Sequence, residues 1–427
     1  LTIIKDFALG TSFGVGVALI VSLFFIPAVL LHLKKPDHLK AAEERTISTN
    51  FFQGISHMVI NRRPCIITIA IVLIIASVIV LPRLKPETNY ISYFKKDSKT
   101  RIATELVDDV FGGSQPVEVV IHGNIKNPDL LKKMKAFQNE VGQLKHIDNT
   151  LSLVNISKEE NKALKGEKKL PTTKQQIAQY LLLMETSDKE MLENFLTFDY
   201  KTSRIQMTME TMSSTKQREV LKEIKGIIDN HFGEDYNVEL TGIPSLGDEV
   251  TKMVVSGQIK SLLSAIILTF VITSVLLRSL KRGLFCSIPI ALTVLINFGI
   301  MGWAGISLDI ATVMIASIAV GIGVDYSIHI FTRFIEEKEL QETPVQALKT
   351  AIFTVGRANL YNAVAVIAGF SIILLSSFPP LISFGGLTAV TMVVSFFGAL
   401  LILPGLIMST IKIKEKVNSD YTVNKNS

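Results

Sequence analysis

Seven apolar runs, each near the length that crosses a bilayer, constrain the fold of this chain more than any other feature. A helix needs roughly 20 apolar residues to span hydrocarbon. The 427 residues are 48% hydrophobic and only 19% charged, which is outside the usual balance of a soluble protein. The sequence therefore predicts a membrane α-helical bundle. Its seven transmembrane helices are expected at 8–31, 64–81, 257–277, 284–304, 309–331, 359–377 and 383–408.

Lys and Arg residues are concentrated in alternate loops, which predicts the orientation of the helices. Short loops rich in these residues stay on the cytoplasmic side. They occur in 34–63, after residue 277, in 332–358 and in the C-terminal tail, whereas the loops 305–308 and 378–382 contain none. We expect a multi-pass protein of the cytoplasmic membrane with residues 82–256 on the external or periplasmic side. The net charge of +6 then reflects topology, so the sequence does not indicate binding to nucleic acid.

The external segment is long enough for a core of its own and has a mixed α/β pattern. A strand is expected at 116–123, a helix at 127–144 and a strand at 149–156. After a polar helical stretch at 173–195, the same order recurs as strand, helix and strand, with the second helix ending at Gly233. This repeated β-α-β order predicts an external α+β domain of the ferredoxin-like type. The lysine-rich segment 158–171 is interpreted as a solvated loop, with a binding role as the weaker alternative.

The first and last membrane segments align without a gap, which suggests internal duplication. Residues 7–30 align on 384–407, and the matched pairs are Phe7 with Phe384, Thr11 with Thr388, Val17 with Val394, Leu23 with Leu400 and Pro27 with Pro404. Duplicated halves are a common plan in transporters. We therefore expect a further N-terminal half before Leu1, with about five membrane helices and a first external domain.

These observations give a predicted division of the chain. It consists of a last membrane helix of the missing first half (1–33), a cytoplasmic linker (34–63), a membrane helix (64–81), the external domain (82–256), a five-helix transmembrane bundle (257–411) and a cytoplasmic tail (412–427).

One predicted membrane helix carries an acid near its middle. Helical spacing places Ser317, Gly321, Asp325 and His329 at successive i, i+4 positions, so they form one stripe. Ser317 and Gly321 are small and, with Gly323, are the residues expected to let another helix pack closely at this site. A carboxylate that faced lipid would cost several kcal/mol, so Asp325 should face protein or a wet cavity. Acids within membrane segments are functional by default, and burial brings their titration toward neutral pH. The alternative is a structural acid whose hydrogen bonds are satisfied inside the bundle.

Other polar residues of the predicted bundle are weaker candidates. Tyr326 lies about 100° further round the helix from Asp325, where it suits a partner on a different helix. His329 could pass protons toward the cytoplasm, or be a polar residue at the wet end of the helix. Asn297 is a candidate for hydrogen bonding across the bundle. Asn359, Tyr361 and Asn362 could do the same, line a water path, or anchor the helix at the interface.

Several motifs resemble the RND superfamily of proton-driven exporters, in particular its MMPL and hydrophobe-exporter branches. "GIGVDYSIHIFTRFIEE" is similar to the tenth membrane helix of that family, and "SFPPLISFGGL" is similar to the link between its last two helices. "NRRP", "FGGSQPVEVVIHG" and "LTGIP" are similar to the second half of the same family. The resemblance implies that the chain carries helices six to twelve and the second porter domain.

The resemblance also implies roles for residues. Asp325 and Tyr326 match the Asp-Tyr pair through which protons pass in these exporters, and Gly321 and Gly323 match its glycines. In the family this pair faces a second pair on helix four, which is absent from this sequence. The external domain is also too short for the docking insertions of tripartite multidrug pumps. That favours the branches that act on lipids and other amphiphiles.

The predicted function is proton-coupled antiport of hydrophobic or amphiphilic molecules, lipids among the candidates, by a transporter made of two halves. The expected partners are the lipid bilayer, an amphiphilic small molecule and the N-terminal half, with a homo-oligomer as an alternative. Two other functions stay open: a non-transporting lipid-binding or sterol-sensing-like protein, and an accessory subunit of protein export. An enzyme is the least favoured class, because His122, His146 and His231 lack metal-ligand spacing and no nucleophile or phosphate-loop motif occurs. No cofactor or metal is expected, and Cys65 and Cys286 provide no disulfide framework.

Overall fold

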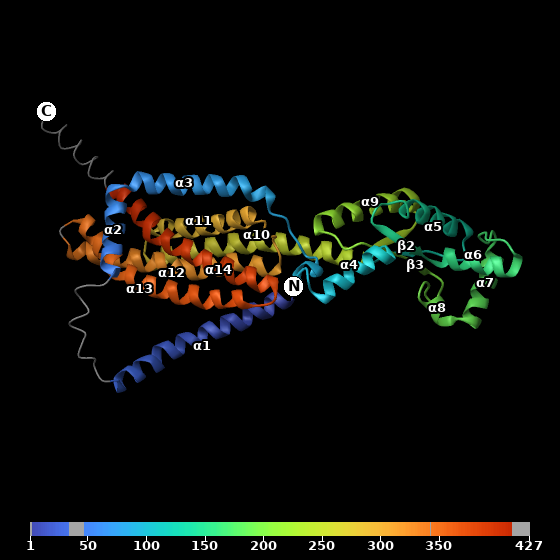
Figure 1. Ribbon diagram of the computed structural model, residues 1–427, viewed down its shortest axis with the longest axis horizontal. Helices are drawn as coiled ribbons and strands as arrows, with labels where there is room; N and C mark the ends of the chain where they lie inside the picture. Colours follow the sequence, from blue (N-terminus) through green and yellow to red (C-terminus); the bar gives the residue numbers. More distant parts are fainter. Residues whose placement is uncertain (1, 34–46, 342, 412–427) are drawn as a thin grey trace, which may run out of the picture. The chain divides into compact units, whose positions relative to one another are not determined.

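The computed structural model describes residues 2–33, 47–341 and 343–411 (Figure 1). The predicted tail at 412–427 and residues 34–46 of the predicted linker lie outside the described residues. The described part of that linker contains a helix, α2 (Ile47–Asn61). The chain divides into two compact units at Gly54, and each unit is described by itself.

Seven helices are long and apolar enough to cross a membrane, as the sequence predicts. They are α1 (Thr2–His32), α3 (Arg63–Val80), α10 (Ile243–Leu276), α11 (Leu280–Ala304), α12 (Ile310–Leu340), α13 (Pro344–Ile372) and α14 (Pro379–Phe397). Three short turns of other helical types flank them: η2 (Leu81–Arg83), η4 (Ile373–Leu375) and the π-helical turn η5 (Gly398–Ile402). In the second unit, α12 packs against α10, α11, α13 and α14.

Two of these helices begin well before their predicted membrane segments. α10 begins at Ile243 rather than at 257, and α13 begins at Pro344 rather than at 359. Pro occupies the first turn of both helices, where its fixed φ suits helix initiation. The turns of α10 and α13 that precede the predicted membrane segments contain charged residues, so hydropathy detects only the apolar part of each helix. α10 therefore runs without interruption from the α/β domain into the membrane bundle (Figure 1).

An α/β domain lies between α3 and α10 in the sequence. Its elements are η3 (Tyr90–Tyr93), α4 (Lys99–Phe111), β1 (Gln115–His122), α5 (Pro128–Val141), β2 (Ile147–Leu151), α6 (Leu153–Lys165), α7 (Lys174–Ser187), α8 (Lys189–Glu193), β3 (Thr202–Met209), α9 (Ser214–Phe232) and β4 (Asn237–Gly242). The four strands form one antiparallel sheet in the order β2-β3-β1-β4.

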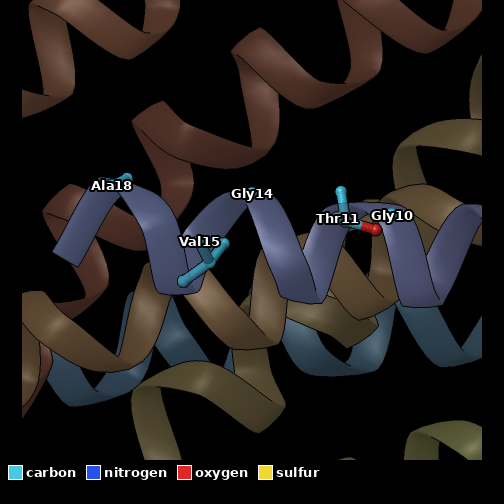
Figure 2. Close-up of a pocket in the computed structure, with 5 residues that line it drawn as sticks. All are labelled: Gly10, Thr11, Gly14, Val15 and Ala18. Carbon is cyan, nitrogen blue, oxygen red and sulfur yellow. The ribbon is translucent and has the colours of Figure 1, made fainter. Parts of the chain in front are cut away.

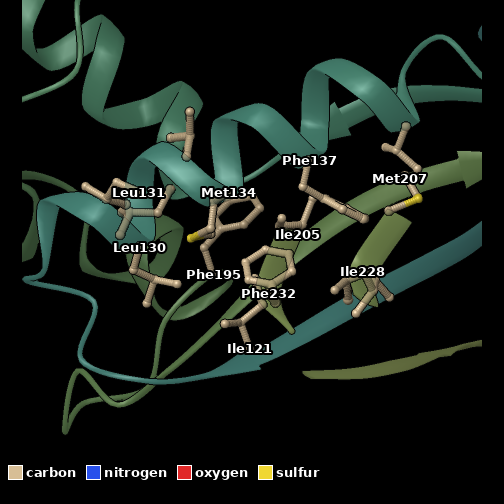
Figure 3. Packing of buried hydrophobic residues seen from close by; sticks show 14 of the residues in the cluster. Ile121, Leu130, Leu131, Met134, Phe137, Phe195, Ile205, Met207, Ile228 and Phe232 are labelled. Atoms are coloured by element: carbon tan, nitrogen blue, oxygen red, sulfur yellow. The ribbon is translucent and has the colours of Figure 1, made fainter. Parts of the chain in front are cut away.

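The sheet has one apolar face, which α5 and α9 cover. Val117, Val119 and Ile121 alternate along β1 and are completely buried, because successive side chains of a strand point to opposite faces. Phe137 of α5 and Phe232 of α9 meet over this face with ring centroids 5.7 Å apart (Figure 3). The core of the domain therefore lies between the sheet and these two helices.

Part of the sequence prediction for this domain is wrong. The strand expected at 149–156 ends at Leu151, because Ser152 caps the N-terminus of α6 and forms a reciprocal capping box with Asn155. The segment expected to be a solvated loop at 158–171 is helical as far as Lys165. The helical stretch expected at 173–195 is two helices, because Asp188 ends α7 and caps α8.

Replacement of Phe137 by Ala should destabilise the α/β domain by about 3 to 5 kcal/mol, because it leaves a cavity at a fully buried site. Hydrogen exchange of the β1 amides in the purified full chain measures this change. Phe198→Ala is the matched control, since Phe198 is 69% exposed and its loss should cost less than about 1 kcal/mol. Equal effects of the two substitutions would contradict the packing described above.

Candidate functional site

The candidate site lies on α12, whose start is fixed by a capping box. Asp309 accepts a hydrogen bond from the Thr312 amide at 2.7 Å, and its own amide donates to the Thr312 hydroxyl at 2.8 Å. The helix then continues to Leu340, so Asp325 lies at its centre. Both ends of α12 are therefore remote from the acid.

The stripe predicted from helical spacing faces away from the second unit. Gly321, Asp325 and His329 are exposed and Ser317 is half-buried. A Cβ atom on Gly321 would meet nothing within 4 Å among the described residues. The side chains of Asp325 and His329 form no ion pair with each other. The structure thus leaves open the surface to which the sequence assigned a closely packed helix.

Tyr326 points to the other side of α12, into the bundle. Its side chain is completely buried, and its ring packs edge-on against Phe396 of α14, with centroids 6.2 Å apart. Its hydroxyl has no hydrogen-bond partner among the described residues. Asp325 and Tyr326 are therefore neighbours in sequence whose side chains serve different faces of the helix.

Gly323 also belongs to the inward face, unlike Gly321. A Cβ atom at this position would overlap the hydroxyl of Ser395 on α14. The absence of a side chain thus allows α12 and α14 to approach closely beside Tyr326. Ser317 and Gly321 lie on the open face, so the structure does not bring together the three small residues that the sequence grouped as helix-packing residues.

Polar groups connect the helices next to Tyr326. The Thr391 hydroxyl donates to Asn297 Oδ1 at 3.1 Å, while Asn297 Nδ2 has no partner among the described residues. Asn359 Nδ2 donates to the Tyr326 carbonyl at 3.2 Å, so Asn359 is a bundle residue rather than an interfacial anchor. Tyr361 is 64% exposed. The contacts between α11, α12, α13 and α14 are therefore polar at several points, and two buried groups, the Tyr326 hydroxyl and Asn297 Nδ2, could still form a hydrogen bond.

A second polar cluster, which the sequence did not reveal, joins the segment after α3 to the α/β domain. We call Glu87, Thr88, Ser214 and Thr251 the linker clasp. Glu87 Oε1 accepts from the Ser214 amide at 3.2 Å and from its hydroxyl at 2.6 Å. The Thr88 amide donates to Ser214 Oγ at 2.9 Å, and the Thr88 and Thr251 hydroxyls are 2.7 Å apart. The clasp thus ties one segment to the starts of both α9 and α10.

The same segment is bonded to the residue that precedes the α12 cap. The Glu87 amide donates to the Leu308 carbonyl at 3.0 Å, and the Leu308 amide donates to the Lys85 carbonyl at 2.9 Å. Nearby, the Tyr93 ring packs edge-on against Phe378, before α14. Burial is the main cause that raises the pKa of the Tyr93 hydroxyl, which therefore stays neutral. The beginning of α12 is thus connected by main-chain hydrogen bonds to the segment that the clasp ties to the α/β domain.

The histidines of the α/β domain are dispersed. His146 contacts Glu210 at 2.5 Å, His231 contacts Glu140 at 2.6 Å, and His122 contacts Thr202 at 3.1 Å. No group of three or more metal-ligating side chains occurs among the described residues. Each of these histidines therefore belongs to a separate local pair.

Comparison with known proteins gives one family and one distant relative. A family model described as the MMPL family matches residues 92–416. The protein named "Putative membrane protein MJ1562", from Methanocaldococcus jannaschii, is 22% identical over 336 residues, which cover 76% of this chain and 84% of that protein. The residues that the family model matches include the α/β domain from Ser92 in η3 onward and the helices α10 to α14.

Replacement of Gly323 by Val should lower the stability of the bundle by about 1 to 3 kcal/mol, because the new side chain must displace Ser395. Gly321→Val is the matched control on the open face and should be nearly neutral for folding. Thermal unfolding of the two purified variants, compared with the unchanged chain, measures the difference. A similar loss in both variants would show that Gly321 is also packed.

Proposed function

We propose that this chain, which belongs to the MMPL family of RND-type membrane transporters, moves hydrophobic or amphiphilic molecules across the membrane and draws on proton passage at Asp325. Members of this family are transporters rather than enzymes. The observation that carries the proposal is the acid stripe at the centre of α12, turned away from the helices that surround the rest of α12.

The cost of a carboxylate in hydrocarbon is the first step of the argument. Asp325 cannot face lipid without a penalty of several kcal/mol unless it is neutralised, wetted or paired. In this proposal another helix, from the same polypeptide or a second copy, covers Ser317, Gly321, Asp325 and His329. The small residues Ser317 and Gly321 allow its backbone to approach, and water between the helices supplies and removes the proton.

The helix α1 supports the idea that such a second set of helices exists. Gly10, Gly14 and Ala18 lie four residues apart and, together with Thr11 and Val15, line a shallow groove on α1 (Figure 2). With the offset of 377 residues (384 − 7), these five positions align on Leu387, Thr388, Thr391, Met392 and Ser395. All five residues are buried in α14. The groove of α1 thus corresponds to the face with which α14 packs in its own bundle.

The α/β domain is the proposed receiver of the substrate. Two β-α-β units, β1-α5-β2 and β3-α9-β4, joined by α6 to α8, and the antiparallel sheet β2-β3-β1-β4 support its assignment as a ferredoxin-like porter domain. The positive-inside distribution of Lys and Arg supports its location outside the cytoplasmic membrane. A polar, folded domain on the far side of the bilayer is what an exporter of amphiphiles needs in order to accept them from the membrane.

The linker clasp is the proposed mechanical connection between the proton site and this domain. A change of charge at Asp325 changes the free energy of α12 in polar relative to apolar surroundings. It therefore shifts the position of α12 against its neighbours. Because Leu308 is hydrogen-bonded to the segment that holds Ser214 and Thr251, a shift at the start of α12 also displaces α9 and α10. The free energy of proton passage thereby acts on the domain that holds substrate.

Replacement of Asp325 by Asn should abolish proton-driven transport and leave the fold intact, because the amide keeps the shape of the acid but cannot exchange its proton. Purified chain in vesicles under an imposed pH gradient is assayed with a fluorescently labelled lysolipid. We expect the rate to fall by about 100-fold or more, as for other proton-transfer groups.

The matched control for this experiment is Asp109→Asn on the exposed surface of α4, which should transport normally. Gradient-driven transport that persists in Asp325→Asn would refute proton coupling at this residue. Loss of transport with unchanged binding of the lysolipid supports the proposal over a lipid-binding protein that does not transport.

Replacement of Glu87 by Gln should uncouple the two parts of the molecule. It weakens the charge-assisted bonds to Ser214, which contribute about 1.5 to 3 kcal/mol, while the α/β core stays folded. We expect transport to slow by about tenfold or more, and hydrogen exchange at the start of α12 to increase. Glu105→Gln, at an exposed ion pair on α4, serves as control and should change neither quantity. Normal transport in Glu87→Gln would exclude the clasp as the connection.

A further inference from the structure

An apolar cleft opens between α3, α11 and the helical segment after α14, which comprises η5 and the residues that follow it. Its volume is about 350 Å³, and all of its lining residues are aliphatic. Ile66, Ala70 and Ile74 line it from α3, Leu292 and Leu295 from α11, and Ile402 from the π-helical turn η5. No residue of α12 lines the cleft, so it is separate from the Asp325 stripe.

The shape of the cleft depends on the π-helical turn. Gly398–Ile402 adopts this wider turn where α14 passes α11, and η5 contacts both α11 and α3. π turns of this kind are rare and occur frequently at functional sites. Here the turn ends at Ile402, the residue of η5 that lines the cleft, so the irregular backbone forms one of the cleft walls.

One end of the cleft is basic. Arg63 begins α3, one turn before Ile66, and its guanidinium donates to the carbonyl of Met408 at 3.3 Å. Arg62 precedes it and is exposed. Neither guanidinium pairs with a carboxylate among the residues that the structure describes. The N–H groups of Arg63 that do not bond Met408, and those of Arg62, are thus directed at no acidic partner.

We propose that this cleft binds one acyl chain of an anionic phospholipid, with the lipid phosphate on Arg62 and Arg63. The acyl chain of the lipid fills aliphatic space that bilayer hydrocarbon would otherwise occupy without order. The guanidinium groups bind the lipid phosphate through paired hydrogen bonds. Basic pockets between membrane helices on the cytoplasmic side bind anionic headgroups. The positive-inside rule predicts that the Arg62 end of α3 is cytoplasmic, so the lipid belongs to the cytoplasmic leaflet.

Charge complementarity selects this occupant over a second copy of the chain. A protein partner would have to place a carboxylate and an aliphatic side chain beside each other at membrane depth, whereas an anionic phospholipid carries both groups in one molecule. The bound lipid would hold α3 against α14 through Arg63. Its binding does not require proton coupling at Asp325, so it can be tested without a transport assay.

Native mass spectrometry of the full chain, released from nanodiscs of equal phosphatidylglycerol and phosphatidylcholine, tests the proposal. We expect phosphatidylglycerol to be retained preferentially on the protein. Ala291→Phe places a ring in the cleft and should remove most of the retained lipid, whereas Ile69→Phe adds the same ring to a lipid-facing position, 53% exposed, and should not.

The headgroup is tested with Arg63→Gln, which keeps a donor for the Met408 carbonyl but loses the charge. We expect the preference for phosphatidylglycerol over phosphatidylcholine to fall about tenfold, which corresponds to about 1.4 kcal/mol. Arg83→Gln, at the other end of α3, is the matched control and should preserve the preference.

Two results would overturn the proposal. Equal retention of the two lipids by the unchanged chain would mean that the basic end selects no headgroup. A dimer that Ala291→Phe dissociates, without loss of lipid, would assign the cleft to a second copy. Melting temperatures of all four variants are measured in parallel, and lipid loss counts only for a variant that melts like the unchanged chain. If Ala291→Phe unfolds, Leu295→Phe takes its place.

Discussion

The free energy of a carboxylate in hydrocarbon is the constraint on which the rest of this structure depends. In a soluble core, Asp325 could be satisfied by local hydrogen bonds, but its own bundle turns it outward and gives it no hydrogen bond or ion pair with the described side chains. In a membrane, this acid therefore has to be neutralised by a proton, hydrated, or covered by another polar surface. That requirement links the position of a single acid to the assembly of the whole transporter.

Much of the fold was predictable because its signals are local. All seven membrane helices follow from hydropathy, and α5 and α9 follow from helical periodicity and their end residues. The errors occur where a capping residue ends a strand, or where a membrane helix extends into a polar segment. Ser152 ends β2 by capping α6, and α10 extends beyond its apolar part to Ile243. Neither effect changes average hydropathy, so a pattern based on hydropathy cannot detect it.

The candidate site was predictable only along one helix. Spacing alone places Asp325 and His329 on one face, but it cannot say which face of α12 meets α14. Packing decides this, since Gly323 approaches Ser395 and the Tyr326 ring packs on Phe396. The linker clasp could not be predicted from the sequence, because Thr88 and Ser214 are 126 residues apart and neither lies in a recognisable motif.

Asp325 and the hydrogen bonds of Leu308 place different demands on α12. In the proposed mechanism, the environment of Asp325 at the centre of α12 changes as the proton arrives and leaves, which requires α12 to move against its neighbours. At its start, the main-chain hydrogen bonds of Leu308 to Lys85 and Glu87 fix α12 to the segment that bonds α9 and α10. α12 is thus packed on its inward face at the centre, open on the face of Asp325, and tied at its start, so in the proposed mechanism a displacement of α12 acts on the segment to which its start is tied. Because α10 continues unbroken from the α/β domain into the bundle and also packs against α12, that displacement has a rigid route to the domain.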